Sequence, residues 1–107
     1  MARFPAKILS LSSPPTFTGG NWTSSFMDVS MFSRVWCVLF MNQPSTANGF
    51  SLQASNDGTN VHYSVSTTAN ANDGVMIVLD PRSYQYIRVS ISVSTVPTIL
   101  HLAVFGE

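Results

Sequence analysis

Few side chains in this sequence could act as acids or bases. His62 and His101 are the only histidines, and His101 lies inside an apolar segment, where a lone histidine usually has a structural role. Asp57, Asp73 and Asp80 each precede glycine or proline, which is the pattern of turn residues. A nucleophile, a base and an orienting group therefore do not come together in any recognisable motif. The sequence predicts no catalytic residue and no enzyme.

Metal and cofactor binding lack a motif as well. Cys37 is the single cysteine, so no Cys/His cluster has the ligand spacing of a zinc site, and no glycine-rich phosphate loop is present. Asp57 and Asp73 leave open a calcium site on the rim of a β-sandwich, but further ligands are scattered. We predict no metal and no cofactor, and we expect Cys37 to be a buried apolar residue.

Aromatic residues and one arginine are the stronger candidates for contacts with a partner. An aromatic side chain on a loop can anchor a partner or plug the end of a β-sandwich, and both readings stay open. An arginine near aromatic residues can hold a sugar or a protein, or can simply cover its neighbours with its stem. The candidate contact residues are Phe4, Phe17, Trp22, Tyr84, Tyr86 and Arg88.

The elements that would position these side chains are strands. Apolar residues alternate or run in short blocks between turn signals, and no helical period is visible. Asp57-Gly58 predicts a tight hairpin turn, and residues 13–21 and 42–49 predict loops. The expected strands are 7–12 (at a sheet edge), 25–30, 34–41, 50–55, 61–66, 75–79, 84–94 and 99–105. About eight strands predict an all-β fold, an antiparallel β-sandwich of jelly-roll type. Residues 1–107 form a single domain with a short N-terminal arm, 1–6.

The segment 34–41 is the most apolar of these strands. Because side chains alternate along a strand, Trp36, Val38 and Phe40 share one face, and the residues between them share the other. Segments 75–79 and 99–105 are also largely apolar on both faces. A sandwich has one core, so we expect a neighbouring subunit to cover the surplus apolar faces.

Composition narrows the possible partners. The 107 residues are 45% hydrophobic and only 9% charged, with a formal net charge of zero. No basic patch suits nucleic acid, and no segment is long enough to span a membrane. Near-zero charge removes the repulsion that keeps proteins apart, so a homo-oligomer is expected. The N-terminus lacks the pattern of a secretory signal, which predicts synthesis in the cytoplasm.

Two resemblances add to this interpretation. Residues 55–60, Ser-Asn-Asp-Gly-Thr-Asn, followed by Tyr86-Ile87-Arg88-Val89, resemble discoidin-type (coagulation factor C-type) jelly rolls, which implies binding of sugars or lipids. In size, low charge and strand pattern, the chain looks like the capsid decoration (cementing) proteins of tailed bacteriophages. That resemblance implies a virion protein made in the host cytoplasm. It would bind the major capsid protein on the outer capsid surface and stabilise neighbouring capsomers.

A carbohydrate-binding module of a fibre or adhesin is the alternative. Such a module needs exposed aromatic rings arranged as a platform, and Trp22, Tyr84 and Tyr86 are the candidates for it. The two functions differ in the surface that they require: a platform of rings for the module, and an apolar protein interface for the decoration protein.

Overall fold

The computed structural model describes residues 5–80 and 84–107, and these residues form strands and connections without a helix. These described residues therefore contain no helix that could cross a membrane. The nine strands are β1 (Ala6–Leu11), β2 (Asn21–Thr23), β3 (Met27–Asp28), β4 (Val35–Met41), β5 (Ser45–Ser55), β6 (Tyr63–Thr67), β7 (Asp73–Leu79), β8 (Tyr86–Val93) and β9 (Leu100–Gly106).

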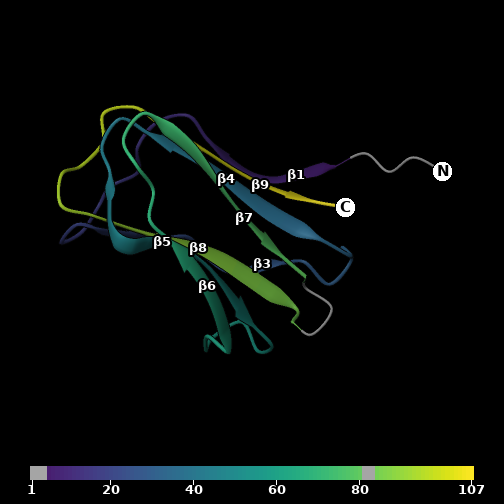
Figure 1. Cartoon of the computed structure of the whole chain (residues 1–107). Helices are drawn as coiled ribbons and strands as arrows, with labels where there is room; N and C mark the ends of the chain where they lie inside the picture. The colour runs from purple at the N-terminus through teal and green to yellow at the C-terminus, as the bar shows by residue number, and fades with distance from the viewer. Residues whose placement is uncertain (1–4, 81–83) are drawn as a thin grey trace.

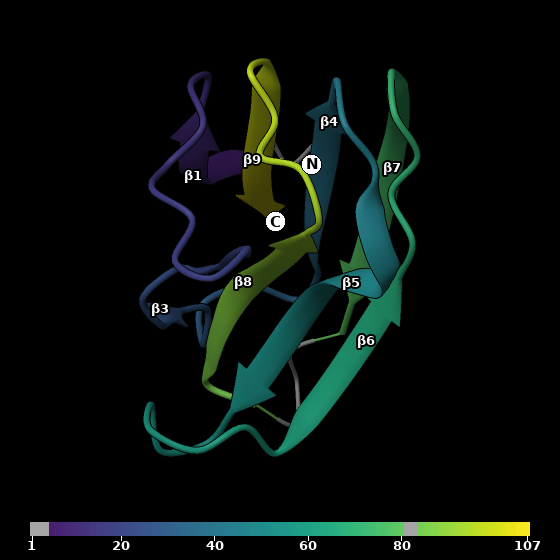
Figure 2. The same ribbon diagram turned by 90° about the vertical axis from the view of Figure 1, so that its left-hand side faces the viewer.

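The strands form two antiparallel sheets that pack face to face (Figure 1). The first sheet has the order β1-β9-β4-β7. The second has the order β2-β8-β5-β6, and β3 pairs with β8 beside β2. Apart from the β5–β6 pair, which stays in the second sheet, successive strands cross between the sheets once β2 and β3 are taken as one interrupted strand (Figure 2). This is the strand order of a jelly roll. The predicted fold class is confirmed, as is the position of the first strand at a sheet edge.

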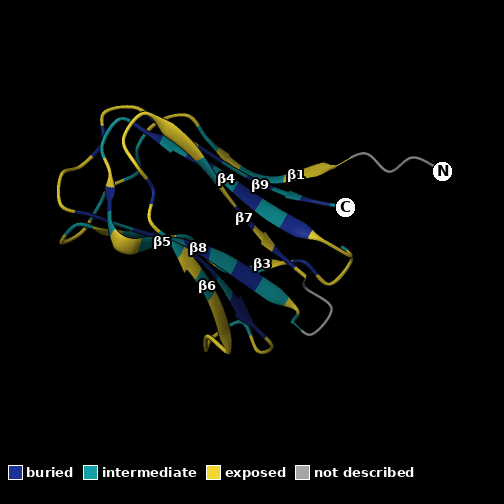
Figure 3. Cartoon of the chain, viewed as in Figure 1, coloured by how far each residue is buried: buried dark blue, intermediate teal, exposed yellow. Residues whose placement is uncertain are grey.

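The core lies between the sheets and is built from alternate residues of the central strands. In β4 the side chains of Val35, Cys37, Leu39 and Met41 point inward and are almost completely buried. Phe50 is the largest fully buried side chain opposite them. Figure 3 shows this alternation as bands of buried and partly buried residues along β4 and β8. Burial of these inward faces is the main stabilising term of the fold.

The predicted strand 25–30 is wrong in its extent. Two short strands, β2 and β3, pair with the same edge of β8, and Ser24 interrupts them. The Ser24 backbone N–H donates to the Val89 carbonyl, while the Val89 N–H donates to the Ser24 hydroxyl, each at 2.9 Å. A side-chain oxygen therefore replaces a backbone carbonyl in the ladder, as serine hydroxyls can do.

The predicted loop 42–49 is also wrong in part, because β5 begins at Ser45. Ser45 pairs with Val93, and the register shifts before pairing resumes at Phe50. The Ser45 hydroxyl accepts the Ala69 N–H at 2.9 Å, and the Ser45 N–H donates to the Ala69 carbonyl at 2.9 Å. Ser45 is thus a buried polar residue whose hydrogen bonds tie β5 to the segment before β7.

The connection between β5 and β6 is longer than the predicted tight hairpin. Gly58 has the expected positive φ of 75°, but the loop runs from residue 56 to residue 62. The Asp57 carboxylate accepts the backbone N–H groups of Thr59 and Asn60, both at 2.8 Å. These bonds stabilise a wider loop, because one aspartate oxygen satisfies two backbone donors.

Candidate functional site

The outward side of the first sheet is apolar. Because alternate residues of β4 fill the core, Trp36, Val38 and Phe40 project to the opposite side. We call the surface formed by these residues and their cross-strand neighbours the outer apolar face. Its residues are Trp36, Val38 and Phe40 on β4, Met76 and Val78 on β7, and Ala103 and Phe105 on β9.

Aromatic residues form one end of the outer apolar face. Trp36 lies between Val78 and Phe105 across the strands, and its ring stacks on Phe105 with centroids 5.7 Å apart. The Arg34 guanidinium lies 5.2 Å from the centroid of the Trp36 ring and forms an ion pair with Glu107. The arginine charge is therefore balanced within the chain, and the rings remain half-buried at the surface.

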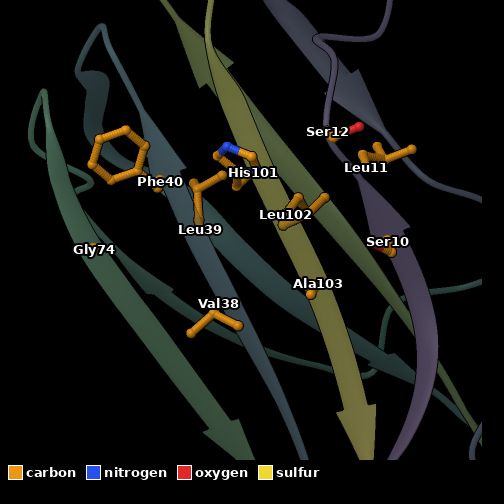
Figure 4. A pocket seen from close by; sticks show the side chains of 10 residues that line it. All are labelled: Ser10, Leu11, Ser12, Val38, Leu39, Phe40, Gly74, His101, Leu102 and Ala103. Carbon is orange, nitrogen blue, oxygen red and sulfur yellow. The ribbon is translucent and has the colours of Figure 1, made fainter.

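A pocket of about 260 Å³ hollows the other end of the sheet (Figure 4). Phe40 and His101 stand beside it, with ring centroids 6.5 Å apart, and Gly74 leaves one side without a side chain. The remaining lining residues are Ser10, Leu11, Ser12, Val38, Leu39, Leu102 and Ala103. This volume is below the roughly 300–1,000 Å³ of small-molecule sites. The pocket suits an apolar side chain of a partner, and His101 is its only titratable group.

Two residues of the outer apolar face are largely exposed. Met76 is 55% exposed and Val78 is 49% exposed, both on β7 at the edge of the sheet. Isolated exposed apolar residues are ordinary, but these adjoin Trp36 and Val38 across the β4–β7 ladder. A contiguous apolar patch of this kind is typical of a protein interaction surface.

The outward side of the second sheet has a different chemistry. Ser51 faces Ser90 on β8 and Ser66 on β6, so polar side chains form a row across the sheet. Arg88 lies beside this row. Its Nε donates to the Gln53 side chain at 2.7 Å, and its guanidinium lies 4.6 Å from the centroid of the Phe26 ring. The predicted contact residue Arg88 is therefore held by neighbours within its own chain.

The predicted aromatic residues do not form one platform. Phe17 and Trp22 pack against the core, in agreement with the interpretation of these rings as plugs of the sandwich. Tyr84 also packs against the core and stacks on Tyr63, with centroids 5.6 Å apart. Tyr86 faces outward beside Gly58. The predicted strand 84–94 begins two residues too early: Tyr84 precedes β8 and packs against the core, so it does not share the outward face of Tyr86.

Phe4 lies outside the described residues. The roles of the six predicted residues in contacts with a partner stay predictions. The sequence predicted a surplus apolar face at Trp36, Val38 and Phe40 and further surplus faces on segments 75–79 and 99–105, but it did not show that these segments lie on the two sides of β4. The same signal was present there, since Met76, Val78 and Phe105 alternate with core residues along strands that are apolar on both sides.

The shifted pKa values of the titratable groups arise from burial in the core and from hydrogen bonds within turns. Burial raises the pKa of the Cys37 thiol to about 12. Hydrogen bonds from the backbone N–H groups of Asn60 and Thr59 and from the Asn60 amide lower the pKa of Asp57 well below its usual range. Two hydrogen bonds from Ser30 likewise lower the pKa of Asp28. Within residues 5–80 and 84–107, no three histidine, cysteine or acidic side chains come together as a metal site.

Comparisons with known proteins place the chain by its fold. No family model matches it, and no curated protein is detectably related to it by sequence. Among solved structures, the PBSX exported protein XepA superposes with a TM-score of 0.69 and 10% identity over 97% of this chain. The chain spans only 37% of the length of XepA.

Two further structures match over most of both chains. The SPBc2 prophage-derived protein YomS has a TM-score of 0.60 and 13% identity, over 99% of this chain and 98% of its own. The coat protein of Tobacco streak virus has a TM-score of 0.52 and 7% identity, over 97% of this chain and 83% of its own. At these identities the likeness establishes a shared fold.

Proposed function

We propose that this chain is a non-enzymatic structural protein of a bacteriophage particle, which binds the outer capsid surface and stabilises neighbouring capsomers. The outer apolar face is the observation that carries this proposal. Trp36, Phe40 and Phe105 give it large aromatic side chains, the residue type that most often dominates binding energy at protein interfaces. Because the net charge of the chain is zero, long-range electrostatic repulsion does not oppose its binding to a protein lattice.

The shared fold supports the same proposal. A jelly roll is a fold of viral coat proteins, and one of the matched structures is a viral coat protein, while another derives from a prophage. Fold alone does not assign a function, so the proposed function depends on the outer apolar face. The pocket beside Phe40 has one titratable group, which is too few for acid–base catalysis by paired groups.

The alternative, a carbohydrate-binding module, has less support in the geometry. Trp22 pairs with the buried Ile91 and packs against the core, whereas Tyr86 points away from the core on the other side of the sheet. These rings cannot contact one flat sugar chain together. A glycan array on which the protein binds a defined glycan would favour the module over the structural protein.

Co-sedimentation with particles assembled without this protein tests the proposal. The purified chain should bind such particles to saturation and raise the temperature at which they lose their contents. Phe40→Ala should weaken binding at least about tenfold, which corresponds to the loss of about 1.4 kcal/mol at an aromatic contact. Phe26→Ala is the matched control, because Phe26 lies beside Arg88 on the second sheet.

Two outcomes would contradict the proposal. One is an absence of binding to any particle. The other is equal binding by the Phe40 and Phe26 variants, provided that circular dichroism shows both to be folded, because binding would then not use the outer apolar face.

A further inference from the structure

The free edge of β7 differs from the other sheet edges. Within the described part of the chain β7 pairs only with β4, in a register without shifts over its seven residues. Natural proteins usually protect such edges with lysine, proline, a bulge or a short strand. β7 contains no lysine, proline or bulge, and its one charged residue, Asp73, stands at its first position: its sequence is Asp-Gly-Val-Met-Ile-Val-Leu. It is therefore a long, regular and apolar edge that can accept another strand.

The other edges are protected, or are shorter and more polar. β1 contains Lys7 and a shift of register before Leu9. The edge opposite β6 in the second sheet is divided into the short strands β2 and β3. β6 has no lysine, proline or bulge, but it is only five residues long, and its Ser64 and Ser66 are polar and exposed. β7 is therefore the longest and most apolar of the edge strands that lack these devices, which makes it the edge best suited to pairing with another chain.

We infer that β7 pairs antiparallel with β7 of a second copy of this chain, about a two-fold axis at Met76, so that the two first sheets join into one. This inference does not rest on the proposed function. Full overlap of residues 73–79 places Met76 opposite Met76 of the second copy and Gly74 opposite Val78 of the second copy. The one charged residue of the strand, Asp73, then faces Leu79 rather than another charge.

The outer faces are complementary in this arrangement. A Cβ added at Gly74 would meet no atom within 4 Å, so the space above this residue is open beside Phe40. The half-exposed Val78 side chain of the second copy would occupy that space, and the reverse contact would follow from the two-fold symmetry. A directly opposed pair in an antiparallel ladder brings such side chains into contact. The two outer apolar faces would then form one continuous surface.

Charge and area set the expected strength. Arg34 is paired with Glu107 within each chain, and the net charge is zero, so the copies do not repel each other. Pairing of one strand spans about 24 Å at about 3.4 Å per residue. Such a contact buries less than the roughly 1,200 Å² of a standard stable interface. We expect a weak dimer in solution that becomes populated where copies are concentrated.

A disulfide across the two-fold axis provides the sharpest test. Opposed residues in an antiparallel pair have Cα atoms about 4.5–5.5 Å apart, within the range that a disulfide bridges. In a glutathione buffer, Met76→Cys should form a covalent dimer at least about tenfold faster than Met31→Cys, since opposed thiols react almost intramolecularly. Met31 is the matched control because it is 74% exposed and lies outside β7. Cross-linking of Met31→Cys at an equal or higher rate would overturn the inference.

Charge exchange gives a second and independent test. Met76→Lys and Met76→Glu should each self-associate about tenfold more weakly than the natural sequence, because like charges then face each other at the axis. An equimolar mixture of the two variants should restore dimers in sedimentation velocity experiments. Met31→Lys should leave self-association unchanged. Dimers that persist in both single variants, or a mixture that stays monomeric, would contradict pairing centred on Met76.

Discussion

The ring of Phe105 stacks on the Trp36 indole on the outside of the first sheet, with centroids 5.7 Å apart and planes inclined by 23°. The two residues are direct cross-strand neighbours of β9 and β4. One side of each ring packs against the sheet, and the other side is only partly covered by other side chains. An aromatic pair in this position stabilises the ladder and at the same time presents apolar surface to a partner.

The stack predicts a coupling between the two residues. Trp36→Ala and Phe105→Ala should each lower the free energy of unfolding by about 1–2 kcal/mol, because each ring is only half-buried. The double variant should lose less than the sum, by a coupling energy of about 0.5–1.5 kcal/mol. Urea unfolding of the four proteins measures this coupling. Strictly additive losses would show that the rings do not stabilise each other.

Cys37 should be chemically inert in the folded protein. Burial raises the pKa of its thiol to about 12, so the reactive thiolate is scarce at pH 8, and the core shields the sulfur from reagents. Iodoacetamide at pH 8 should modify Cys37 only as fast as the protein unfolds, and urea should accelerate the reaction. Rapid labelling without denaturant would show that β4 opens readily.

Substitution of the same residue tests the polarity of the core. Cys37→Ser should lower the free energy of unfolding by about 1–3 kcal/mol, because it buries a hydroxyl in apolar surroundings. Cys37→Ala, which removes the sulfur without adding a polar group, should cost about 1 kcal/mol. Equal losses for the two variants would mean that the hydroxyl finds a hydrogen bond at this position.

Asp57 should make the stability of the protein depend on pH. Its folded-state pKa is lowered by hydrogen bonds from Asn60 and Thr59, so the carboxylate stabilises the fold above its unfolded pKa of about 3.9. This contribution is lost as the pH falls toward the lowered folded-state value. Asp57→Ala should therefore lower Tm most at pH 5–7, and the difference from the natural sequence should shrink below about pH 4.

A neighbouring residue serves as the control for this pH dependence. Asn56→Ala removes an exposed side chain that makes no hydrogen bond to the described residues, so any difference in Tm should be the same at every pH. A difference for Asp57→Ala that does not change between pH 3 and pH 7 would contradict the role of the charged carboxylate.

The sequence predicted those parts of the fold that depend on the local pattern of single strands. β1, β4, β6, β7, β8 and β9 were expected within two residues of their actual ends, because short apolar runs or alternating patterns between turn residues leave little choice. The two shortest strands, β2 and β3, were misplaced. β2 and β3 exist because the edge of β8 offers them partners, and no local pattern in residues 21–30 reveals a partner that is 58 or more positions away.

The sequence predicted that the candidate site is an apolar surface, but it predicted only some of the residues that form this surface. The surplus of apolar faces follows from the sequence, as Trp36, Val38 and Phe40 show. The sheet order determines which strands lie beside β4. The contributions of Met76 and Phe105 to the outer apolar face could therefore be recognised only once that order was known. The aromatic residues in loops were less useful for predicting the site. Phe17 packs against the core, and the residue type alone does not show whether such a ring points inward or outward.

Gly19 and Gly20 should differ in their tolerance of a side chain. Both have positive φ, at 60° and 81°, so alanine at either position should cost about 1–2 kcal/mol of backbone strain. A Cβ at Gly20 would also lie 2.5 Å from the Val93 carbonyl oxygen, whereas a Cβ at Gly19 would meet nothing within 4 Å.

The Val93 oxygen cannot easily move away, because Val93 ends a core strand and its N–H donates to the Gly20 carbonyl at 2.7 Å. We therefore expect Gly20→Ala to lower the free energy of unfolding by about 1–3 kcal/mol more than Gly19→Ala. Urea unfolding of the two variants measures this difference. Equal losses would mean that the loop before β2 shifts as a unit and that the close approach of Gly20 to β8 is not required for the fold.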